Sequence, residues 1–171
     1  DGDGDPTRWL YTNTENFTDA GGSCGTEGGY NFNLEPVTEL PVTITAAGYA
    51  TFFAPVAVNA TGVKAYTVAI NGKLATLTEI EGGVIPANTG VVLEAAENSY
   101  NLAITTTEAT ATSALLGTTA ATYIKDDAYV LGYIKVDGED VVGFGTAVKN
   151  QEGNSWKNNS HKAYLPKGAL P

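Results

Sequence analysis

The chain has one cysteine and one histidine, and this scarcity limits the chemistry that it can perform. Cys24 has no second cysteine with which to form an internal disulfide, so the fold must depend on burial and hydrogen bonds. His161 cannot by itself complete a zinc site or a Ser-His-Asp arrangement. A Cys-His pair would require the fold to bring together two residues far apart in the sequence. We therefore expect His161 to be a structural or surface residue.

Long apolar runs and positive charge are also lacking. No stretch approaches the ~20 apolar residues of a membrane-spanning helix, so we expect no membrane insertion. Nineteen Asp and Glu residues exceed nine Lys and Arg residues, which gives a net charge of −10. This charge repels phosphate backbones and anionic lipid headgroups, and it therefore disfavours nucleic acid and membrane surfaces as partners. It also serves solubility, which is a common role of acidic surfaces.

The 171 residues are 43% apolar, which is enough for a folded core. A chain of this length buries about two-thirds of its unfolded surface, and it is predicted to hold one domain or one domain with a fragment of its neighbour. It opens with "DGDGD", without a methionine or a signal peptide. We therefore expect a processed or trimmed piece of a larger protein.

Apolar residues alternate along most of the chain, or they form short β-branched blocks bounded by Gly, Pro, Asn and Asp. Strands at 63–70 and 73–80 flank Asn71-Gly72, a dipeptide that suits a two-residue type I′ turn. A second hairpin is predicted to join 128–136 to 141–148 through "DGED". Further strands are expected at 41–45, 49–54, 89–95, 99–104 and 162–166. The pattern predicts an all-β fold of antiparallel sheets, a β-sandwich or a barrel.

The composition of the sequence predicts that the chain has two parts. Residues 1–40 are polar and rich in glycine, and they are interpreted as the end of a preceding module with its linker. Residues 41–171 form the predicted β-sandwich domain. Within it, eight threonines between 105 and 122 indicate either an edge strand or an exposed crossing. In "GGVIPANTGVVLEA" (82–95), the glycine pair and the proline predict a corner between sheets, with Val84 and Ile85 entering the core.

Several motifs in this order resemble a known module. They are "AGYATFFAPVAV" (47–58), "VKAYTVAINGKLATLTEIEGGVIPANTGVVL" (63–93), "AYVLG" (128–132), "VVGFG" (141–145) and "HKAYLP" (161–166). The chain from about residue 40 resembles a β-sandwich module found near the C-terminus of secreted and cell-surface proteins of Bacteroidetes. The resemblance implies an accessory domain, placed after parts that bind or cleave glycans.

The junction "FNLEPVTELPV" (32–42) is similar to the connection from a preceding domain, sometimes a trefoil lectin. Only the last strands of that domain would be present, so lectin activity does not carry over. Relatives also continue past "KGALP" with another strand. The resemblance therefore implies an unpaired sheet edge, which either segment 1–40 or a neighbouring copy would cover.

The polar stretch "KNQEGNSWKNNSHK" (149–162) holds the candidate glycan site. Trp156 lies among amides, with Asn154 and Asn158 beside it, and an aromatic face with neighbouring amides suits a sugar ring. The alternative is that Trp156 folds back to cap one end of the sandwich.

Carboxylates supply the remaining candidate chemistry. Asp1, Asp3 and Asp5 alternate like the start of a calcium loop, but Pro6 and Thr12 stand where an EF-hand needs Gly and Glu. This is either a weak cation site or a frayed acidic terminus. Other carboxylates lie in predicted turns or point to opposite faces, so we expect no catalytic pair and no required cofactor.

The sequence thus predicts a non-catalytic, secreted or surface-exposed module that spaces or presents a neighbouring glycan-active or adhesive domain. A carbohydrate-binding module is one alternative. A surface assembly subunit that pairs with other copies through a sheet edge is another.

Overall fold

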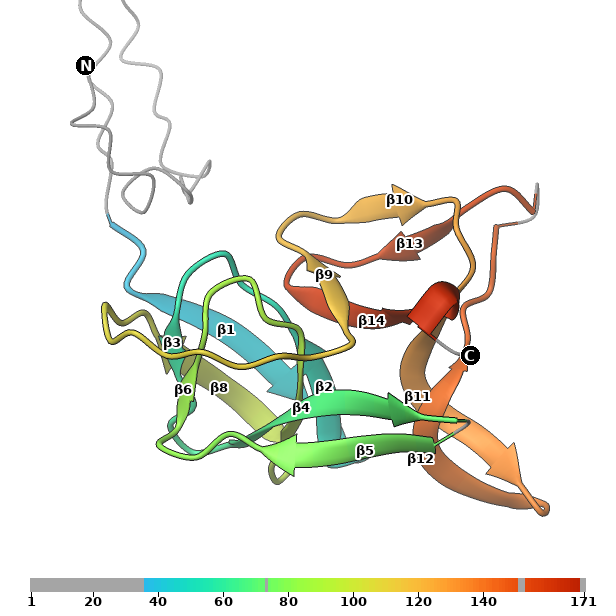
Figure 1. Cartoon of the computed structure of the whole chain (residues 1–171), viewed down its shortest axis with the longest axis horizontal. Helices are drawn as coiled ribbons and strands as arrows, with labels where there is room; N and C mark the ends of the chain where they lie inside the picture. Colours follow the sequence, from blue (N-terminus) through green and yellow to red (C-terminus); the bar gives the residue numbers. More distant parts are fainter. Residues whose placement is uncertain (1–35, 73, 151–152, 170–171) are drawn as a thin grey trace, which may run out of the picture. The chain divides into compact units, whose positions relative to one another are not determined.

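The computed structural model describes residues 36–171, apart from 73, 151–152 and 170–171. The chain divides into two units, Asp1–Thr38 and Glu39–Pro171. This boundary lies two residues before the predicted one. All the strands described below belong to the second unit (Figure 1).

The described part of the chain is all-β. Its strands are β1 (Glu39–Ile44), β2 (Tyr49–Phe52), β3 (Val58–Asn59), β4 (Lys64–Asn71), β5 (Leu74–Glu79), β6 (Val84–Ile85), β7 (Val91–Glu94), β8 (Asn98–Ala103), β9 (Leu116–Thr118), β10 (Thr122–Ile124), β11 (Ala128–Val136), β12 (Glu139–Thr146), β13 (Trp156–Asn158) and β14 (Lys162–Pro166). A single 3-10 turn, Lys167–Ala169, follows β14. The residues that the structure describes contain no α-helix, which agrees with the sequence pattern.

Every strand pair is antiparallel. Two sheets have four strands, in the orders β2-β7-β4-β5 and β12-β11-β14-β9. Three further sheets pair β1 with β8, β3 with β6, and β10 with β13. The predicted set of antiparallel sheets is therefore confirmed. The last predicted strand, β14, is not at a sheet edge, because it lies between β11 and β9 in the sheet order.

The hairpin β4–β5 is confirmed, but its turn is displaced from the predicted position. Asn71 is the last residue of β4 and pairs with Leu74, so the chain reverses between these two residues. Gly72, with φ of 62°, supplies the left-handed conformation, whereas Asn71 remains in the strand. The prediction of a type I′ turn centred on Asn71-Gly72 is wrong because register pairing extends one residue further than the dipeptide suggests.

The hairpin β11–β12 has a two-residue type I′ turn. Val136 pairs with Glu139, and the two residues between them, Asp137 and Gly138, have φ of 51° and 90°. Two positive φ values are what a type I′ turn requires, and Asp-Gly is a favoured pair for it. The second strand therefore begins at Glu139 and not at the predicted 141, because the turn needs only two residues.

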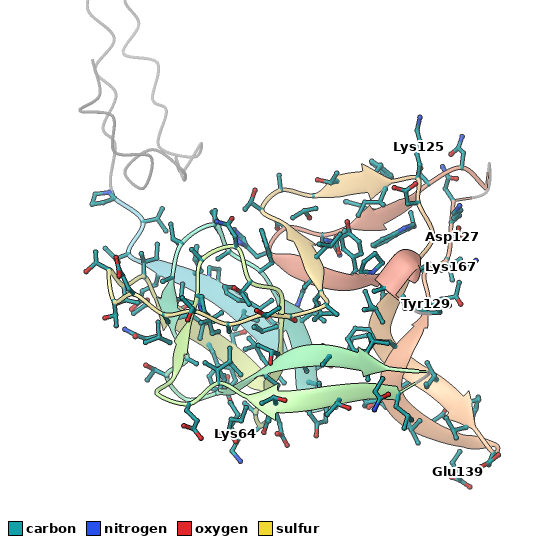
Figure 2. The ribbon with its side chains drawn as sticks, in the orientation of Figure 1. Lys64, Lys125, Asp127, Tyr129, Glu139 and Lys167 are labelled. Carbon is teal, nitrogen blue, oxygen red and sulfur yellow. The ribbon has the colours of Figure 1, made fainter. Side chains whose placement is uncertain are left out.

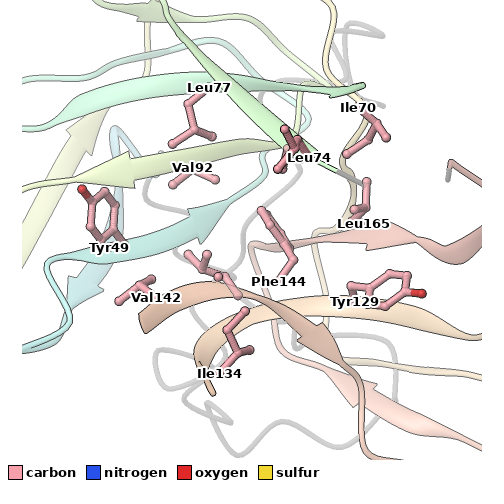
Figure 3. A pocket seen from close by; sticks show the side chains of 13 residues that line it. Tyr49, Ile70, Leu74, Leu77, Val92, Tyr129, Ile134, Val142, Phe144 and Leu165 are labelled. Atoms are coloured by element: carbon pink, nitrogen blue, oxygen red, sulfur yellow. The ribbon is translucent and has the colours of Figure 1, made fainter. Parts of the chain in front are cut away.

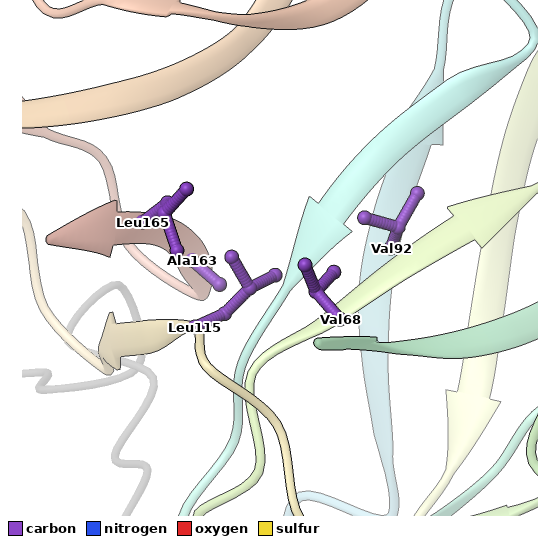
Figure 4. Packing of buried hydrophobic residues seen from close by; sticks show 5 residues of the cluster. All are labelled: Val68, Val92, Leu115, Ala163 and Leu165. Atoms are coloured by element: carbon purple, nitrogen blue, oxygen red, sulfur yellow. The ribbon is translucent and has the colours of Figure 1, made fainter. Parts of the chain in front are cut away.

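Apolar alternation places the core. Leu40, Val42 and Ile44 of β1 are buried while the residues between them are exposed. A second cluster joins β4, β7 and β14 with the segment before β9 (Figure 4). Its buried members are Val68, Val92, Leu115, Ala163 and Leu165. Because these residues come from positions 68 to 165, the cluster connects the early and late parts of the unit.

Short strands account for most of the elements that the sequence pattern did not predict. β3, β6, β9, β10 and β13 contain two or three residues each, too few for an alternation to be recognised. The threonine-rich segment forms no strand from 105 to 115. It crosses beside β4, where the Ala114 amide donates to the Val68 carbonyl (2.7 Å) and the Val68 amide donates to Ser113 Oγ (3.1 Å).

The predicted corner at 82–95 is confirmed in outline. Gly82 and Gly83 have φ of 82° and 69°, so the reversal uses backbone conformations that glycine tolerates best. Ile85 is buried, and β7 begins at Val91 after the turn. Val84 is only half-buried, so the core takes one of the two residues that the sequence suggested.

Candidate functional site

Trp156 lies in β13 and not in a loop, and its side chain is turned inward. It is only 4% exposed, and its Nε1 donates a hydrogen bond to the Asp126 carbonyl (3.0 Å). Its ring meets Tyr164 edge-on, with the centroids 5.2 Å apart. A ring this buried exposes little of its face, and its position agrees with the capping alternative.

The two asparagines predicted to assist Trp156 lie in different environments. Asn158 is buried, and its Nδ2 donates to Thr118 Oγ1 (2.9 Å) and to the Lys162 carbonyl (2.8 Å). Asn154 is exposed in the turn before β13, where Ser155 Oγ approaches its Oδ1 (3.5 Å). Trp156 and Asn158 line one cavity, to which Asn154 does not contribute. Glycan binding by the protein stays a prediction.

His161 has a structural position. Its Nδ1 lies 2.9 Å from the Phe53 carbonyl, and its own carbonyl accepts a hydrogen bond from the Phe53 amide (3.1 Å). The imidazole also stacks on Phe52, with the ring centroids 6.2 Å apart. These contacts connect the turn before β14 to the end of β2, as expected for a residue that stabilises the fold.

The remaining predicted chemistry falls outside the described residues or is absent from them. Asp1, Asp3, Asp5 and Cys24 all lie in the part of the chain that is not described. Across the described ranges, no three His, Cys, Asp or Glu side chains gather closely enough to hold a metal ion. A search of the same ranges finds no helix with the length and apolar character needed to cross a membrane.

Asp127 is the centre of an ion-pair cluster near the start of β11 (Figure 2). Its two carboxylate oxygens lie 2.8 Å from Lys149 Nζ and 3.1 Å from Lys167 Nζ. Hydrogen bonds from Lys149 and then Lys167 hold the pKa of Asp127 below its usual value. The cluster ties the segments after β12 and after β14 to the start of β11, which is a structural role.

Glu94 of β7 is the centre of a second polar cluster. It accepts hydrogen bonds from the hydroxyls of Tyr66 in β4 (2.6 Å) and Tyr49 in β2 (3.2 Å). These bonds, chiefly that from Tyr66, lower the pKa of Glu94, and the bond to Glu94 raises the pKa of Tyr66 to about 12. The cluster joins three neighbouring strands of one sheet. Two phenols already occupy the carboxylate, so it is poorly suited to act as a catalytic base.

An open groove lined mainly by apolar side chains lies between the hairpins β4–β5 and β11–β12 (Figure 3). Its volume is about 440 Å³. One wall is formed by Ile70, Leu77 and Val92, and the other by Leu131, Val142 and Phe144. Leu77 is 42% exposed, and Leu74 at the rim is 74% exposed. We call this feature the hairpin groove.

Three strand edges that border the hairpin groove lack backbone partners among the described residues, and one of them is the outer edge of β12, which pairs only with β11. β5 pairs only with β4, and all six of its residues are exposed. β11 pairs with β12 over 129–136, but with β14 only at Ala128 and Tyr129. One side of β11 from Val130 to Val136 is therefore open in the described part of the chain. In an antiparallel strand, every second residue directs its amide and carbonyl to each side, so this edge presents free donors and acceptors.

A second cavity, of about 430 Å³, also borders β11. Val130 and Gly132 contribute to it together with the more polar Thr51, Asn158 and Lys162. Burial lowers the pKa of Lys162, since a charged ammonium is less stable away from water. The open edge of β11 is therefore bordered by an apolar groove and by a more polar cavity.

Sequence reasoning missed the hairpin groove. Its walls come from hairpins about sixty residues apart, and the pairing of faces between them depends on the tertiary fold. The available signal was the pair of leucines in the predicted strand "KLATLTEI" (73–80), for which the sequence suggests no packing partner.

Comparisons with known proteins gave no match. No family model, no curated protein and no solved structure shows significant similarity to the chain.

Proposed function

We propose that the chain is a non-catalytic structural module, arranged as an antiparallel β-sandwich, that accepts an extended segment of a neighbouring domain or polypeptide. Its role is to space or present that neighbour. The observation that carries the proposal is the hairpin groove together with the unpaired strand edges beside it.

The groove and the edges together favour an extended backbone as the occupant. An apolar groove alone suits a small lipophilic molecule as well as a protein, because about 440 Å³ lies within the usual range of small-molecule sites. A free strand edge requires backbone donors and acceptors, which a lipophilic molecule does not supply. Adding a strand satisfies both features in one step, since its backbone pairs with the edge while alternate side chains fill the groove.

The chemistry of the described polar residues supports a non-catalytic role. Asp127 and Asp140 form ion pairs with lysines, Glu94 accepts from two tyrosines, and His161 contacts the backbone of the residue after β2. Each of these groups therefore has a structural use. The resemblance to modules of secreted and cell-surface proteins supports an extracellular location beside a glycan-active or adhesive domain.

A titration with synthetic peptides tests this proposal. The probe is a terminally blocked peptide whose seven-residue core alternates valine and threonine, and the control peptide has the same residues with the valines contiguous. Isothermal titration calorimetry of the full chain should show binding of the alternating peptide, and binding of the contiguous one should be about tenfold weaker. That expectation follows because only alternation puts all the valines on the groove side. Equal affinity, or no binding of either peptide, would rule the proposal out.

Two matched variants locate the binding. Leu77→Lys places a charge in the hairpin groove, whereas Thr76→Lys places the same charge on the opposite face of β5. Leu77→Lys should lower the affinity for the alternating peptide by about tenfold, because the apolar contact of part of a leucine side chain is lost. Thr76→Lys should change the affinity by less than about twofold, which is the effect of a distant surface charge. Circular dichroism would show that both variants are folded.

A further inference from the structure

The geometry points to one edge and one orientation for the accepted segment. We propose that the segment pairs antiparallel with Val130–Val136 of β11 and carries basic residues at its N-terminal end. This inference rests on the proposed function and adds the position, direction and charge of the partner strand.

The position of β14 in the sheet identifies the edge. β14 pairs with β11 at Leu165 and Pro166, and the chain then leaves the row as the 3-10 turn Lys167–Ala169. Seven residues of β11 continue beyond that point with no partner on this side in the described ranges. A strand beside them would span about 23 Å at 3.3 Å per residue. It would continue the position in the sheet that β14 already occupies, whereas a strand beside β5 or beside the outer edge of β12 would add a new position to its sheet.

The alternation of side chains on β11 defines the composition of the segment. Leu131 lies on the same face as its partner Phe144, and both line the hairpin groove. Ile134 of β11 also lines the hairpin groove, whereas Gly132 lines the second cavity with Thr51 and Lys162. A neighbouring strand has the same two faces. The alternate side chains of the segment that share the face of Leu131 and Phe144 would therefore be apolar.

The charge at the β11–β12 turn determines which end of the accepted segment carries the basic residues. Asp137, Glu139 and Asp140 lie at or beside this turn, and Lys135 pairs with Asp140 (2.9 Å). Three carboxylates against one lysine leave the turn acidic. At the other end of β11, Lys149 and Lys167 already flank Asp127. A basic residue is therefore favoured only at the end of the segment that lies beside the turn.

The antiparallel direction follows from the sheets themselves. Each strand pair in the described residues is antiparallel, including both pairs that β11 makes. β11 runs toward the turn, so the N-terminus of an antiparallel segment would lie beside Asp137 and Gly138. A second copy of the chain is a poor occupant, because two molecules each with a net charge of −10 repel one another.

Peptides with displaced charge test the orientation. Two blocked peptides share the alternating valine–threonine core, and they differ only in whether two lysines stand at the N-terminal or the C-terminal end. The N-terminal form should bind the full chain about threefold more tightly at low salt, which is the size expected of exposed ion pairs. In 0.5 M NaCl the difference should fall below about twofold, because the charges are screened.

A nitroxide attached to either end of the N-terminal lysine peptide tests the position. A label at the peptide N-terminus should broaden the NMR signals of Asp137 and Gly138 most strongly, and a label at its C-terminus should broaden that of Tyr129. The reverse pattern, or strongest broadening along β5, would overturn the inference while leaving strand acceptance intact.

Equal affinity of the two lysine peptides at low salt would also overturn the inference. Dimerisation of the chain without peptide, detected by sedimentation, would contradict it by making a second copy the occupant. The inference and the proposed function fail separately, because the alternating peptide of the previous section tests binding without regard to orientation.

Discussion

Gly117 in β9 pairs with Ala163 and lies directly against the Phe53 ring. A Cβ at this position would overlap Cβ and Cγ of Phe53, atoms too close to the backbone to move freely. By contrast, a Cβ at Gly132 in β11 would have no heavy atom within 4 Å. Two glycines in strands of one sheet therefore differ in what they tolerate.

Gly117→Ala should destabilise the protein by about 1–3 kcal/mol, which is the usual cost of overpacking a filled core. Urea unfolding followed by circular dichroism measures the change, with Gly132→Ala as the matched control. Unfolding midpoints that are equal for the two variants would contradict the packing described here.

Trp156 has both a buried ring and a buried hydrogen bond. Trp156→Phe keeps an aromatic ring but removes the donor to the Asp126 carbonyl. We expect a loss of about 1–3 kcal/mol, since a partly buried acceptor is left without its partner. Tyr123→Phe, at a side chain that is 67% exposed, is the control and should be nearly neutral in the same unfolding experiment. A neutral effect of Trp156→Phe would mean that Trp156 is not part of the core.

The Glu94 cluster predicts a pH dependence of stability. The pKa of Glu94 is lowered in the folded state, so its contribution is present above its unfolded pKa of 4.5 and is lost as the pH falls through the lower folded value. The pKa of Tyr66 is raised to about 12, so its contribution is present below pH 10 and is lost as the pH rises toward 12. The stability difference between the wild type and Glu94→Gln should therefore narrow at both extremes. A difference that is constant from pH 3 to pH 11 would contradict this cluster.

At the scale of elements, tight hairpins depend on the few residues at their turns. Gly138 has φ of 90°, a conformation that side chains rarely adopt. Gly138→Ala should cost about 1–2 kcal/mol for this reason alone, because nothing lies within 4 Å of the added Cβ. Thermal unfolding compared with Gly132→Ala in the adjoining strand separates backbone strain from the loss of glycine flexibility. A wild-type melting temperature for Gly138→Ala would exclude the type I′ turn.

The elements also show which parts of the fold the sequence can predict. Strands such as β1, β4, β11 and β14 have alternation or turn residues within their own segments, and the sequence predicts them. β3 and β6 have two residues each and form only because the rest of the fold brings them together. The same reason explains Trp156. Its amide-rich neighbours suggested a loop, but pairing of β13 with β10 and the partner at Asp126 draw it inward.

For the whole molecule, the sequence predicted the class of fold but not the surface that matters for the proposal. Net charge, alternation and scarce histidine indicated an acidic all-β module without an evident catalytic set. The hairpin groove depends on two hairpins meeting across the unit, and neither hairpin contains a signal for the other. The expected bare edge is likewise not at β14, which is paired on both sides. Bare edges lie instead on β5 and β12, which end their sheets, and on the part of β11 that extends past β14.

Amide hydrogen exchange at β11, measured by NMR on the full chain, tests strand acceptance most directly. In the chain alone, every second amide from Val130 to Val136 should exchange fast, because those amides point away from β12. Saturating alternating valine–threonine peptide should slow these amides at least about tenfold and leave the exposed β10 strand unchanged. Slow exchange of all seven amides without peptide, or no change when the peptide binds, would contradict the account.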